Sequence, residues 1–240
     1  MPTVIMKQDV IAIDGPAAAG KSTVASRIAE KLGAHYVNTG NMYRAVTYSA
    51  LRTGLKSPFD RKKIKEMLEN IDINYVTGTD GKLILTMDEK PAGTEIRAPE
   101  ISRHVSEIAA MPEVRDWLVN RQRQFVSLGT IVMEGRDIGT VIFPDAKYKF
   151  FLTASPEVRA KRRLEQSGET ADGATIASVA KEIAARDEMD SKRDIAPLRK
   201  ADDAVLVDCS EMTADEVVDR IYAIVNKSML QSRKQSINVS

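Results

Sequence analysis

The sequence lacks features on which several classes of protein depend. A single cysteine, Cys209, in 240 residues excludes an internal disulfide and fits a reducing compartment. The two histidines, His35 and His104, do not have the spacing of metal ligands, so no zinc site is predicted. Lysine and arginine number 35 against 34 aspartates and glutamates, so the basic excess of a general nucleic-acid-binding protein is missing.

Long apolar segments are also missing. No run approaches the roughly 20 apolar residues that span a bilayer, and residues Met1 to Asp9 lack the apolar stretch of a signal peptide. With 43% hydrophobic residues, the chain can still bury a sizeable core. We therefore expect a cytoplasmic monomer that binds neither membranes nor nucleic acid.

Short apolar runs alternate with helical patterns along most of the chain. The runs predict strands at Val10–Ile13, Tyr36–Val37, Ile131–Met133, Tyr148–Leu152 and Ala204–Val207. One helical pattern follows the phosphate-loop segment that is described below. Others predict helices at Met42–Arg52, Pro99–Ala110, Pro112–Phe125 and Ala174–Glu188. This alternation favours one α/β domain over residues 1–240, with a parallel sheet of about five strands flanked by helices.

One segment departs from that alternation. Ile71–Tyr75 and Leu83–Met87 alternate apolar with polar residues, and the turn-rich Thr77–Lys82 lies between them. This pattern is typical of an antiparallel hairpin. We therefore predict a small antiparallel β module inserted at residues 64–97.

The most specific motif is the phosphate loop between the first strand and its helix. Its spacing is glycine, four residues, then Gly-Lys-Ser, and Thr23 follows. The residues predicted to bind ATP are Gly15, Pro16, Ala17, Ala18, Ala19, Gly20, Lys21, Ser22 and Thr23. Backbone N–H groups of such a loop surround phosphates, the lysine reaches the β- and γ-phosphates, and the serine hydroxyl binds Mg²⁺. The loop alone does not distinguish a kinase from a switch or a motor.

Two further motifs follow predicted strands, at the sheet edge where parallel α/β proteins bind ligands. In Asn38–Arg44, a helix N-terminus could receive a second phosphate with Arg44 as a clamp, although an ordinary turn and cap explains the motif equally well. In Glu134–Thr140, Arg136 could bind a phosphate and Asp137 a sugar or base. An internal ion pair between Arg136 and its acidic neighbours is the alternative. The position after a strand favours binding.

Basic residues gather in the last third of the chain. Arg159, Arg162 and Arg163 precede a loop that contains Gly168 and Gly173, and Arg186–Arg193 follows. We predict a lid at residues 159–175, whose arginines would neutralise charge on a transferring phosphoryl group. A solvated basic helix with internal pairs, such as Glu157 with Lys161, is the alternative.

Taken together, four motifs resemble those of bacterial cytidylate kinases, in the nucleoside monophosphate kinase group. They are residues 13–23, 39–44, 134–146 and 186–193, in the same order, and the likeness extends from Val10 to Leu230. The resemblance implies a P-loop kinase fold. It also implies transfer of the γ-phosphoryl group of ATP, with Mg²⁺, to CMP or dCMP to give CDP or dCDP.

The resemblance implies roles by position. Lys21, Arg159, Arg162, Arg163 and Arg186 would be catalytic. Arg44, Arg136 and Arg186 would grip the acceptor phosphate, Ser106, Arg115 and Asp137 would read the base, and Asp190 and Arg193 would contact the sugar; Thr39 and Tyr43 belong to the same site. The chain departs from the family pattern at Asn38, Thr39 and Glu134, where aspartate, serine and aspartate are common.

Two other functions remain open from the residues alone. One is a kinase for another monophosphate, a sugar or a shikimate-like acceptor, which would not need both Arg115 and Asp137 to read a base. The other is a non-catalytic nucleotide-dependent switch, which would not need the acceptor-side arginines.

Overall fold

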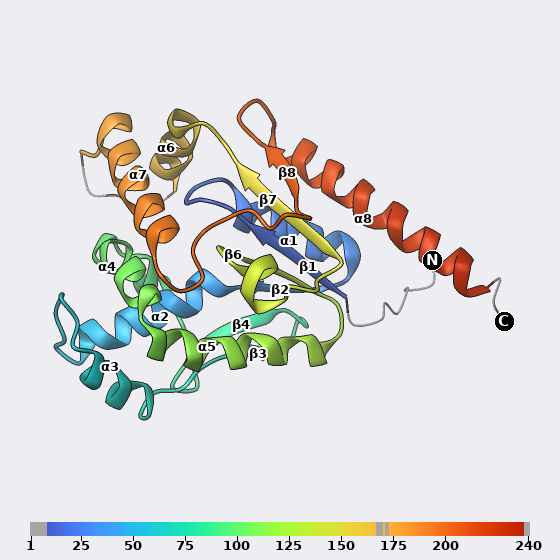
Figure 1. Ribbon diagram of the computed structural model, residues 1–240. Coiled ribbons are helices and arrows are strands. Elements are labelled where there is room, and N and C mark those ends of the chain that lie inside the picture. Colours follow the sequence, from blue (N-terminus) through green and yellow to red (C-terminus); the bar gives the residue numbers. More distant parts are fainter. Residues whose placement is uncertain (1–8, 167–169, 171–172, 238–240) are drawn as a thin grey trace.

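A computed structural model describes residues 9–166, 170 and 173–237. Five parallel strands form the central sheet in the order β2-β6-β1-β7-β8 (Figure 1). Their bounds are β1 Val10–Asp14, β2 His35–Asn38, β6 Ile131–Gly135, β7 Tyr148–Thr153 and β8 Val205–Asp208. The predicted α/β class is confirmed. The prediction about a signal peptide concerns residues 1–9, which lie outside the described part except for Asp9.

Alternate residues of β1 enter two separate cores. Ile11 and Ile13 pack with α1 (Lys21–Leu32) and α8 (Ala214–Ile237) on one face of the sheet. Val10 and Ala12 pack on the other face with α2 (Thr39–Arg52), α4 (Pro99–Ala110) and α5 (Pro112–Gln124). Both faces of β1 are covered, which is why its sequence is a continuous apolar run. Each fully buried isoleucine contributes about 1.5–3 kcal/mol to folding.

Helix ends follow the capping residues in the sequence. Gly33, with φ of 62°, ends α1 in the left-handed conformation that glycine adopts readily. Ser155 caps α6 (Pro156–Glu165), and Thr213 forms a reciprocal capping pair with Glu216 at the start of α8. α2 begins three residues before the predicted Met42, because Asn38 caps it. α7 spans Ile176–Lys192, four residues beyond the predicted end.

The predicted antiparallel module is present as a second sheet. β3 (Ile73–Thr77) pairs with β4 (Leu83–Met87), and a short strand, β5 (Lys90–Pro91), adds to β4. α3 (Arg61–Leu68) precedes this sheet and the 3-10 helix η1 (Thr94–Arg97) follows it. The Tyr75 hydroxyl donates to the Asn38 carbonyl at 3.0 Å, so the module is tied to the end of β2. The bounds 64–97 remain a prediction, since α3 begins earlier.

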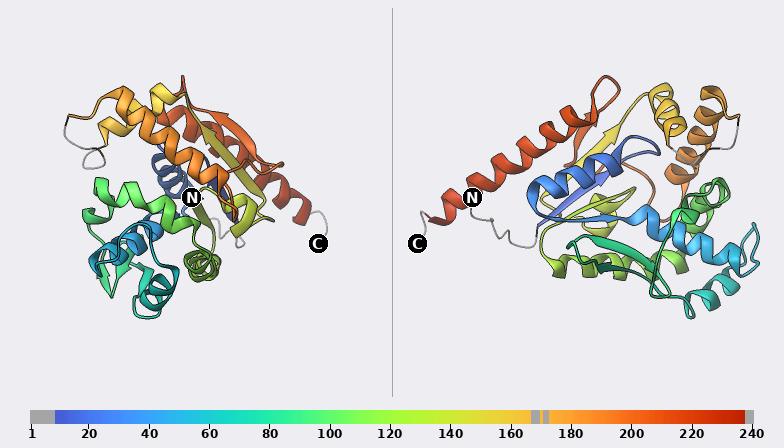
Figure 2. Two further views of the ribbon diagram at one scale, coloured as in Figure 1. Left: turned by 60° about the vertical axis from the view of Figure 1, so that its left-hand side comes forward. Right: turned by 180° about the vertical axis from the view of Figure 1, so that it is seen from behind.

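Helices α6 and α7 lie side by side at the carboxyl edge of the central sheet, on the side away from the antiparallel module (Figures 1 and 2). Ala160, Val179 and Ile183 pack there against Ala17 of the phosphate loop. The predicted lid, 159–175, includes residues 167–169, 171 and 172, and these, Gly168 among them, lie outside the described part. No helix in the described residues is both long and apolar enough to span a membrane.

Candidate functional site

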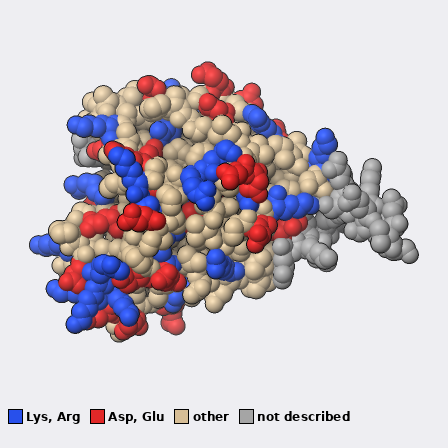
Figure 3. Space-filling view, in the orientation of Figure 1, with Lys and Arg blue, Asp and Glu red and all other residues tan. Residues whose placement is uncertain are grey.

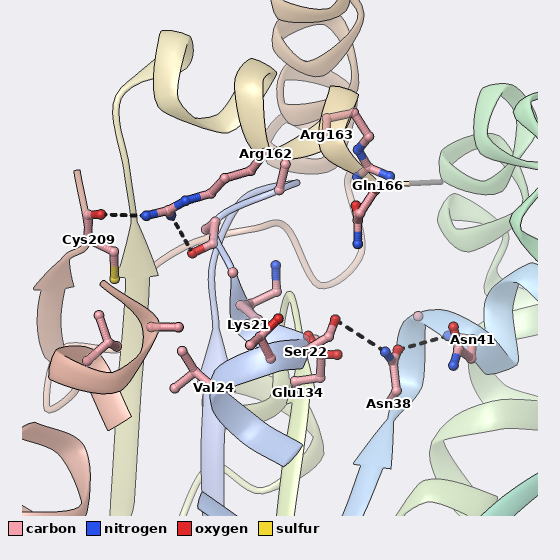
Figure 4. A pocket seen from close by; sticks show the side chains of 18 of the residues that line it. Lys21, Ser22, Val24, Asn38, Asn41, Glu134, Arg162, Arg163, Gln166 and Cys209 are labelled. Carbon is pink, nitrogen blue, oxygen red and sulfur yellow. Dashed lines mark hydrogen bonds between the residues drawn. The ribbon is translucent and has the colours of Figure 1, made fainter. Parts of the chain in front are cut away.

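The predicted motifs converge at the carboxyl edge of the central sheet. A pocket of about 330 Å³ opens there between the phosphate loop, the start of α2, the end of β6 and helices α6 and α7 (Figure 4). Parallel strands with helices on both faces place these segments together, although they are up to 168 residues apart, from Ala18 to Arg186. Members of each predicted motif therefore line one cavity, whereas the residues predicted to read the base and sugar do not line it.

The phosphate loop depends on backbone conformations that its small residues permit. At Gly15, with φ of 150°, a Cβ atom would lie 2.0 Å from the Leu152 carbonyl oxygen of β7. Gly20 has φ of 91°, and Ala18 has φ of 58° in the left-handed region. The loop therefore passes so close to β7 that a side chain at Gly15 would displace it.

Lys21 is buried in this loop. Its Nζ donates to the Pro16 carbonyl at 2.7 Å. Burial, with help from the charge of Arg136, lowers the pKa of Lys21 to about 7. An anion beside Nζ would favour the charged form.

Arg159 lies behind the phosphate loop and does not line the pocket. Its Nε donates to the Ala154 carbonyl at 3.1 Å and its Nη1 to the Ala17 carbonyl at 3.2 Å. It also forms an ion pair with Asp187, whose other oxygen accepts from the Ala17 amide at 2.9 Å. These contacts position the loop. The predicted contact of Arg159 with the transferring phosphoryl group stays a prediction.

Basic residues from five segments line the pocket. Its six arginines are Arg44, Arg97, Arg136, Arg162, Arg163 and Arg186. Burial lowers the pKa of Arg186 to about 9 and those of Arg44 and Arg163 to about 10, and repulsion between the arginines adds to each shift. On the face seen in Figure 3, by contrast, basic and acidic residues are interspersed. The concentrated positive charge of this pocket fits a polyanionic ligand.

Arg186 carries a buried hydrogen-bond donor that favours an anionic ligand. Its Nε is buried and has no hydrogen-bond partner among the described residues. A buried donor without a partner is costly to leave unsatisfied, particularly on a charged group. A phosphate oxygen in the pocket would satisfy it. Arg44, in contrast, already donates to the Ser102 hydroxyl at 2.9 Å.

Arg162, the second of the three predicted lid arginines, donates to backbone carbonyls of two segments that line the pocket. Arg162 donates to the Cys209 carbonyl at 2.8 Å and to the Ala19 carbonyl at 3.4 Å, and thus joins the phosphate loop to the segment after β8 (Figure 4). Val24, Met212 and Val217 line the same end of the pocket with apolar surface. This end suits the flat base of a nucleotide whose phosphates lie on the loop.

A hydrogen-bonded chain runs from Ser22 to Glu134 at the other end. The Asn38 amide donates to the Ser22 hydroxyl at 3.5 Å and to the Tyr36 hydroxyl at 3.1 Å. The Tyr36 hydroxyl donates to Glu134 at 2.8 Å, and burial together with that carboxylate raises the pKa of Tyr36. Asn38 also caps α2 through the Asn41 amide, at 3.0 Å. Asparagine performs these roles without the charge of the more common aspartate.

The hydroxyl of Ser22 and the carboxylate of Glu134 are the oxygen donors that suit Mg²⁺ in this pocket. Within the described ranges, no group of three or more His, Cys, Asp or Glu side chains could hold a metal ion. Magnesium ordinarily binds through one or two protein oxygens together with nucleotide phosphates and water. The residues present therefore fit an ion that arrives with the nucleotide.

The residues predicted to read the base and sugar form a second, buried cluster. Asp190 accepts from the Ser106 hydroxyl at 3.0 Å and from Arg136 Nε at 2.9 Å. Asp137 forms an ion pair with Arg115 and lies 3.6 Å from Arg193. Arg136 therefore pairs with a distant aspartate rather than with its neighbours in sequence. Although burial acts to raise the pKa of Asp190, the nearby arginines hold it below its ordinary value.

Thr39 and Tyr43 support this cluster from α2. The Thr39 hydroxyl is buried and donates to the Glu134 carbonyl at 2.8 Å, so it fixes the end of β6. The guanidinium of Arg115 lies 5.8 Å from the centre of the Tyr43 ring. Burial raises the pKa of Tyr43 to about 12. Both residues lie where the motif predicts, and the contacts they make here are with protein groups.

Sequence reasoning missed four residues of the site. Arg97 reaches the pocket from the end of the inserted module. Asp187 accepts from the Ala17 amide of the phosphate loop, and the Tyr36 hydroxyl donates to Glu134. Asp14 accepts from the Ile138 amide, next to Asp137, at 2.8 Å. Asp14 and Asp187 adjoin predicted site residues, which was the available signal. Arg97 has no local motif.

Comparisons with known proteins identify the family of this chain. A family model described as cytidylate kinase matches residues 11–227. The cytidylate kinase of Clostridium botulinum strain Hall is 46% identical over 217 residues, which cover 90% of this chain and 97% of that protein. That of Carboxydothermus hydrogenoformans is 45% identical, with the same coverage. A solved structure, an uncharacterized protein from Eubacterium ventriosum, shares the fold with a TM-score of 0.51 and 13% identity, covering 91% of this chain and 98% of its own. The chain belongs to the cytidylate kinase family, as its four motifs predict.

Proposed function

We propose that this pocket transfers the γ-phosphoryl group of ATP to the phosphate of CMP or dCMP through the residues described above. Membership in the family carries the activity itself, an ATP-dependent phosphotransferase reaction that gives CDP or dCDP. The observation that supports the assignment of residues is that a phosphate loop, six arginines and a buried cluster of polar residues lie together at one sheet edge.

The donor half is the loop Gly15–Thr23. Its amides and Lys21 would hold the β- and γ-phosphates, and the apolar surface near Met212 would hold the base. Mg²⁺, bound with ATP near Ser22 and Glu134, would neutralise phosphate charge. Arg162 and Arg163 both line the cavity and would approach the transferred group.

The acceptor half needs no strong general base, because a nucleoside monophosphate is already an anionic nucleophile. Arg44, Arg136 and Arg186 would hold its phosphate in line with the γ-phosphoryl group of ATP. Arg97 lines the same cavity and would add a fourth positive charge. The arginines are already in place before reaction, so catalysis rests on positioning and on charge neutralisation.

Base recognition would come from the Arg115–Asp137 pair and Ser106. Cytosine offers an amine donor beside ring acceptors, which complement a carboxylate and a guanidinium respectively. Uracil has a carbonyl in place of that amine, which would face the Asp137 carboxylate without a hydrogen bond. Asp190 and Arg193 would contact the sugar.

We also propose that the protein works as a cytoplasmic monomer. Every residue assigned above comes from one chain, so the site requires no contribution from a second copy. Light scattering of the purified protein, with and without nucleotides, tests the monomer; a stable dimer would contradict it.

An acceptor panel tests the function. Coupled ADP release is measured with CMP, dCMP, UMP, AMP, dTMP and shikimate, with Lys21→Met as the inactive control. We expect the highest kcat/KM with CMP and dCMP, a lower value with UMP and background rates with the others. Preference for AMP, dTMP or shikimate would contradict the base assignment. ADP release that no acceptor stimulates would favour the switch.

A further inference from the structure

A buried carboxylate connects the donor loop to the acceptor cluster. Asp14 is the last residue of β1 and directly precedes Gly15 of the phosphate loop. Its two oxygens accept from the Ile138 amide and the Gly139 amide, each at 2.8 Å. Asp14 is only 5% exposed. One side chain therefore binds backbone that lies 124 and 125 residues further along the chain.

Those two amides open a short π-helical turn, η3 (Ile138–Ile142). Asp137 occupies the cap position of this turn but makes no capping hydrogen bond with its side chain. Aspartate at a helix cap ordinarily accepts a hydrogen bond from an amide of its own first turn. Here the carboxylate of Asp137 instead faces Arg115 and Arg193.

Asp14 and Lys149 both pack against the backbone of this turn at Gly139. A Cβ atom there would be crowded by Lys149 Cδ at 3.2 Å and would lie in ordinary contact with Asp14 Oδ2 at 3.4 Å. Burial raises the pKa of Asp14 to about 7, while its two amide hydrogen bonds oppose the shift. A carboxylate is thus retained where burial disfavours its charge.

We propose that Asp14 is a positioning residue for acceptor recognition: it caps η3 in place of Asp137 and so leaves the Asp137 carboxylate to pair with Arg115 in the proposed base site. This inference rests on the proposed role of Asp137 in reading the base. Asp14 itself does not line the pocket. Without it, the amides of Ile138 and Gly139 would compete with Arg115 for the Asp137 carboxylate.

The test uses Asp14→Asn, in which an amide can accept at one oxygen but presents N–H groups where the other oxygen accepted. Asp137→Asn is measured beside it, and Asp215→Asn, at an exposed carboxylate paired with Arg27, is the matched control. KM and kcat are determined separately for CMP, UMP and ATP. Isothermal calorimetry gives the Kd of CMP for the same proteins.

We expect Asp14→Asn to raise KM and Kd for CMP by about tenfold or more. KM for ATP should change by less than about twofold, and the preference for CMP over UMP should fall, a change that general loss of structure would not produce. The control should match the parent protein. If Asp137→Asn weakens CMP binding and Asp14→Asn does not, the capping proposal is overturned while the proposed function stands. If neither variant affects CMP, the role of Asp137 fails and the proposal fails with it.

An equal rise in KM for ATP and CMP would also overturn the proposal, because Asp14 would then act through the phosphate loop. Should Asp14→Asn not fold, amide hydrogen exchange on the parent protein supplies a second test. We expect the amides of Ile138 and Gly139 to exchange slowly, and rapid exchange of both would overturn the inference.

Discussion

Asp187 and Arg159 hold the same residue of the phosphate loop from its two backbone groups. Asp187 accepts from the Ala17 amide at 2.9 Å, Arg159 donates to the Ala17 carbonyl at 3.2 Å, and the two side chains pair with each other. Arg186, adjacent to Asp187 on α7, lines the anion pocket. The same helix thus fixes the loop and supplies a charge to the ligand.

This arrangement predicts different effects for two substitutions at Asp187. Asp187→Ala removes both the ion pair and the acceptor for the Ala17 amide, so we expect a loss of about 3–5 kcal/mol in unfolding free energy. Asp187→Asn keeps an acceptor for that amide, so its loss should be smaller. Denaturant unfolding of both variants measures the difference. Equal stability of Asp187→Ala and the parent protein would show that the contacts of Asp187 with Ala17 and Arg159 do not stabilise the fold.

Kinetics of Arg159→Met distinguish an arginine that positions the phosphate loop from one that contacts the transferring phosphoryl group. If Arg159 acts by holding the loop, the variant should raise KM for ATP, by about tenfold, and lower the unfolding free energy. A group that contacts only the transferring phosphoryl would lower kcat without changing KM for ATP. Steady-state kinetics with saturating CMP decide between them. Arg162→Met is the companion variant, because Arg162 lines the pocket.

Replacement of Arg186 should raise KM for CMP without lowering the stability of the ligand-free protein. Arg186→Met removes a partly exposed arginine whose buried Nε has no partner in the described residues, so the ligand-free variant should be at least as stable as the parent protein. KM for CMP should nevertheless rise by about a hundredfold, since one charged phosphate contact is lost. Thermal unfolding with added inorganic phosphate provides the control. Phosphate should raise the Tm of the parent protein more than that of the variant; an equal rise would contradict the anion site.

Nucleotide binding should take up a proton through Lys21. Burial lowers the pKa of Lys21 to about 7, and phosphates beside Nζ should raise it. At pH 8, binding of Mg·ADP should therefore consume up to about one proton. Calorimetry in buffers of different ionisation enthalpy measures this number, and Lys21→Met should reduce it. Asp14, whose pKa is also about 7, could add a smaller uptake that the variant would retain. No uptake in the parent protein would contradict the pKa of Lys21.

The same shift has a consequence for stability. The folded-state pKa of Lys21 lies below the unfolded value of 10.5, so the unfolded chain holds this proton over a range where the folded chain does not. The contribution of Lys21 to the unfolding free energy should therefore increase as pH rises from about 7 to about 10.5. Comparison of Lys21→Met with the parent protein across that range isolates it.

Local patterns predicted most of the framework. The apolar run at β1 and the spacing of the phosphate loop depend on residues close in sequence, and each lies where it was predicted. Residues that act through distant contacts were not predictable in this way. Asp14 binds backbone 124 residues away, and Asp187 binds Ala17 across 170 residues. Their partners became neighbours only when the sheet assembled.

The three lid arginines illustrate the same limit. Arg159, Arg162 and Arg163 lie within about one helical turn of α6, so their spacing places them on similar sides of the helix. Their positions along the helix axis nevertheless differ. Arg159 reaches the back of the phosphate loop, whereas Arg162 and Arg163 reach the cavity. Spacing alone could not assign these separate contacts.

Product identification tests the central claim most directly. The protein is incubated with Mg·ATP and CMP, and phosphorus NMR follows the nucleotides, with Lys21→Met as the control. We predict that CDP and ADP appear in equal amounts and that the control forms neither at a rate above about one thousandth of the parent rate. ADP that forms without CDP, or CDP formation that survives the loss of Lys21, would contradict the assignment of this pocket as the site of phosphoryl transfer.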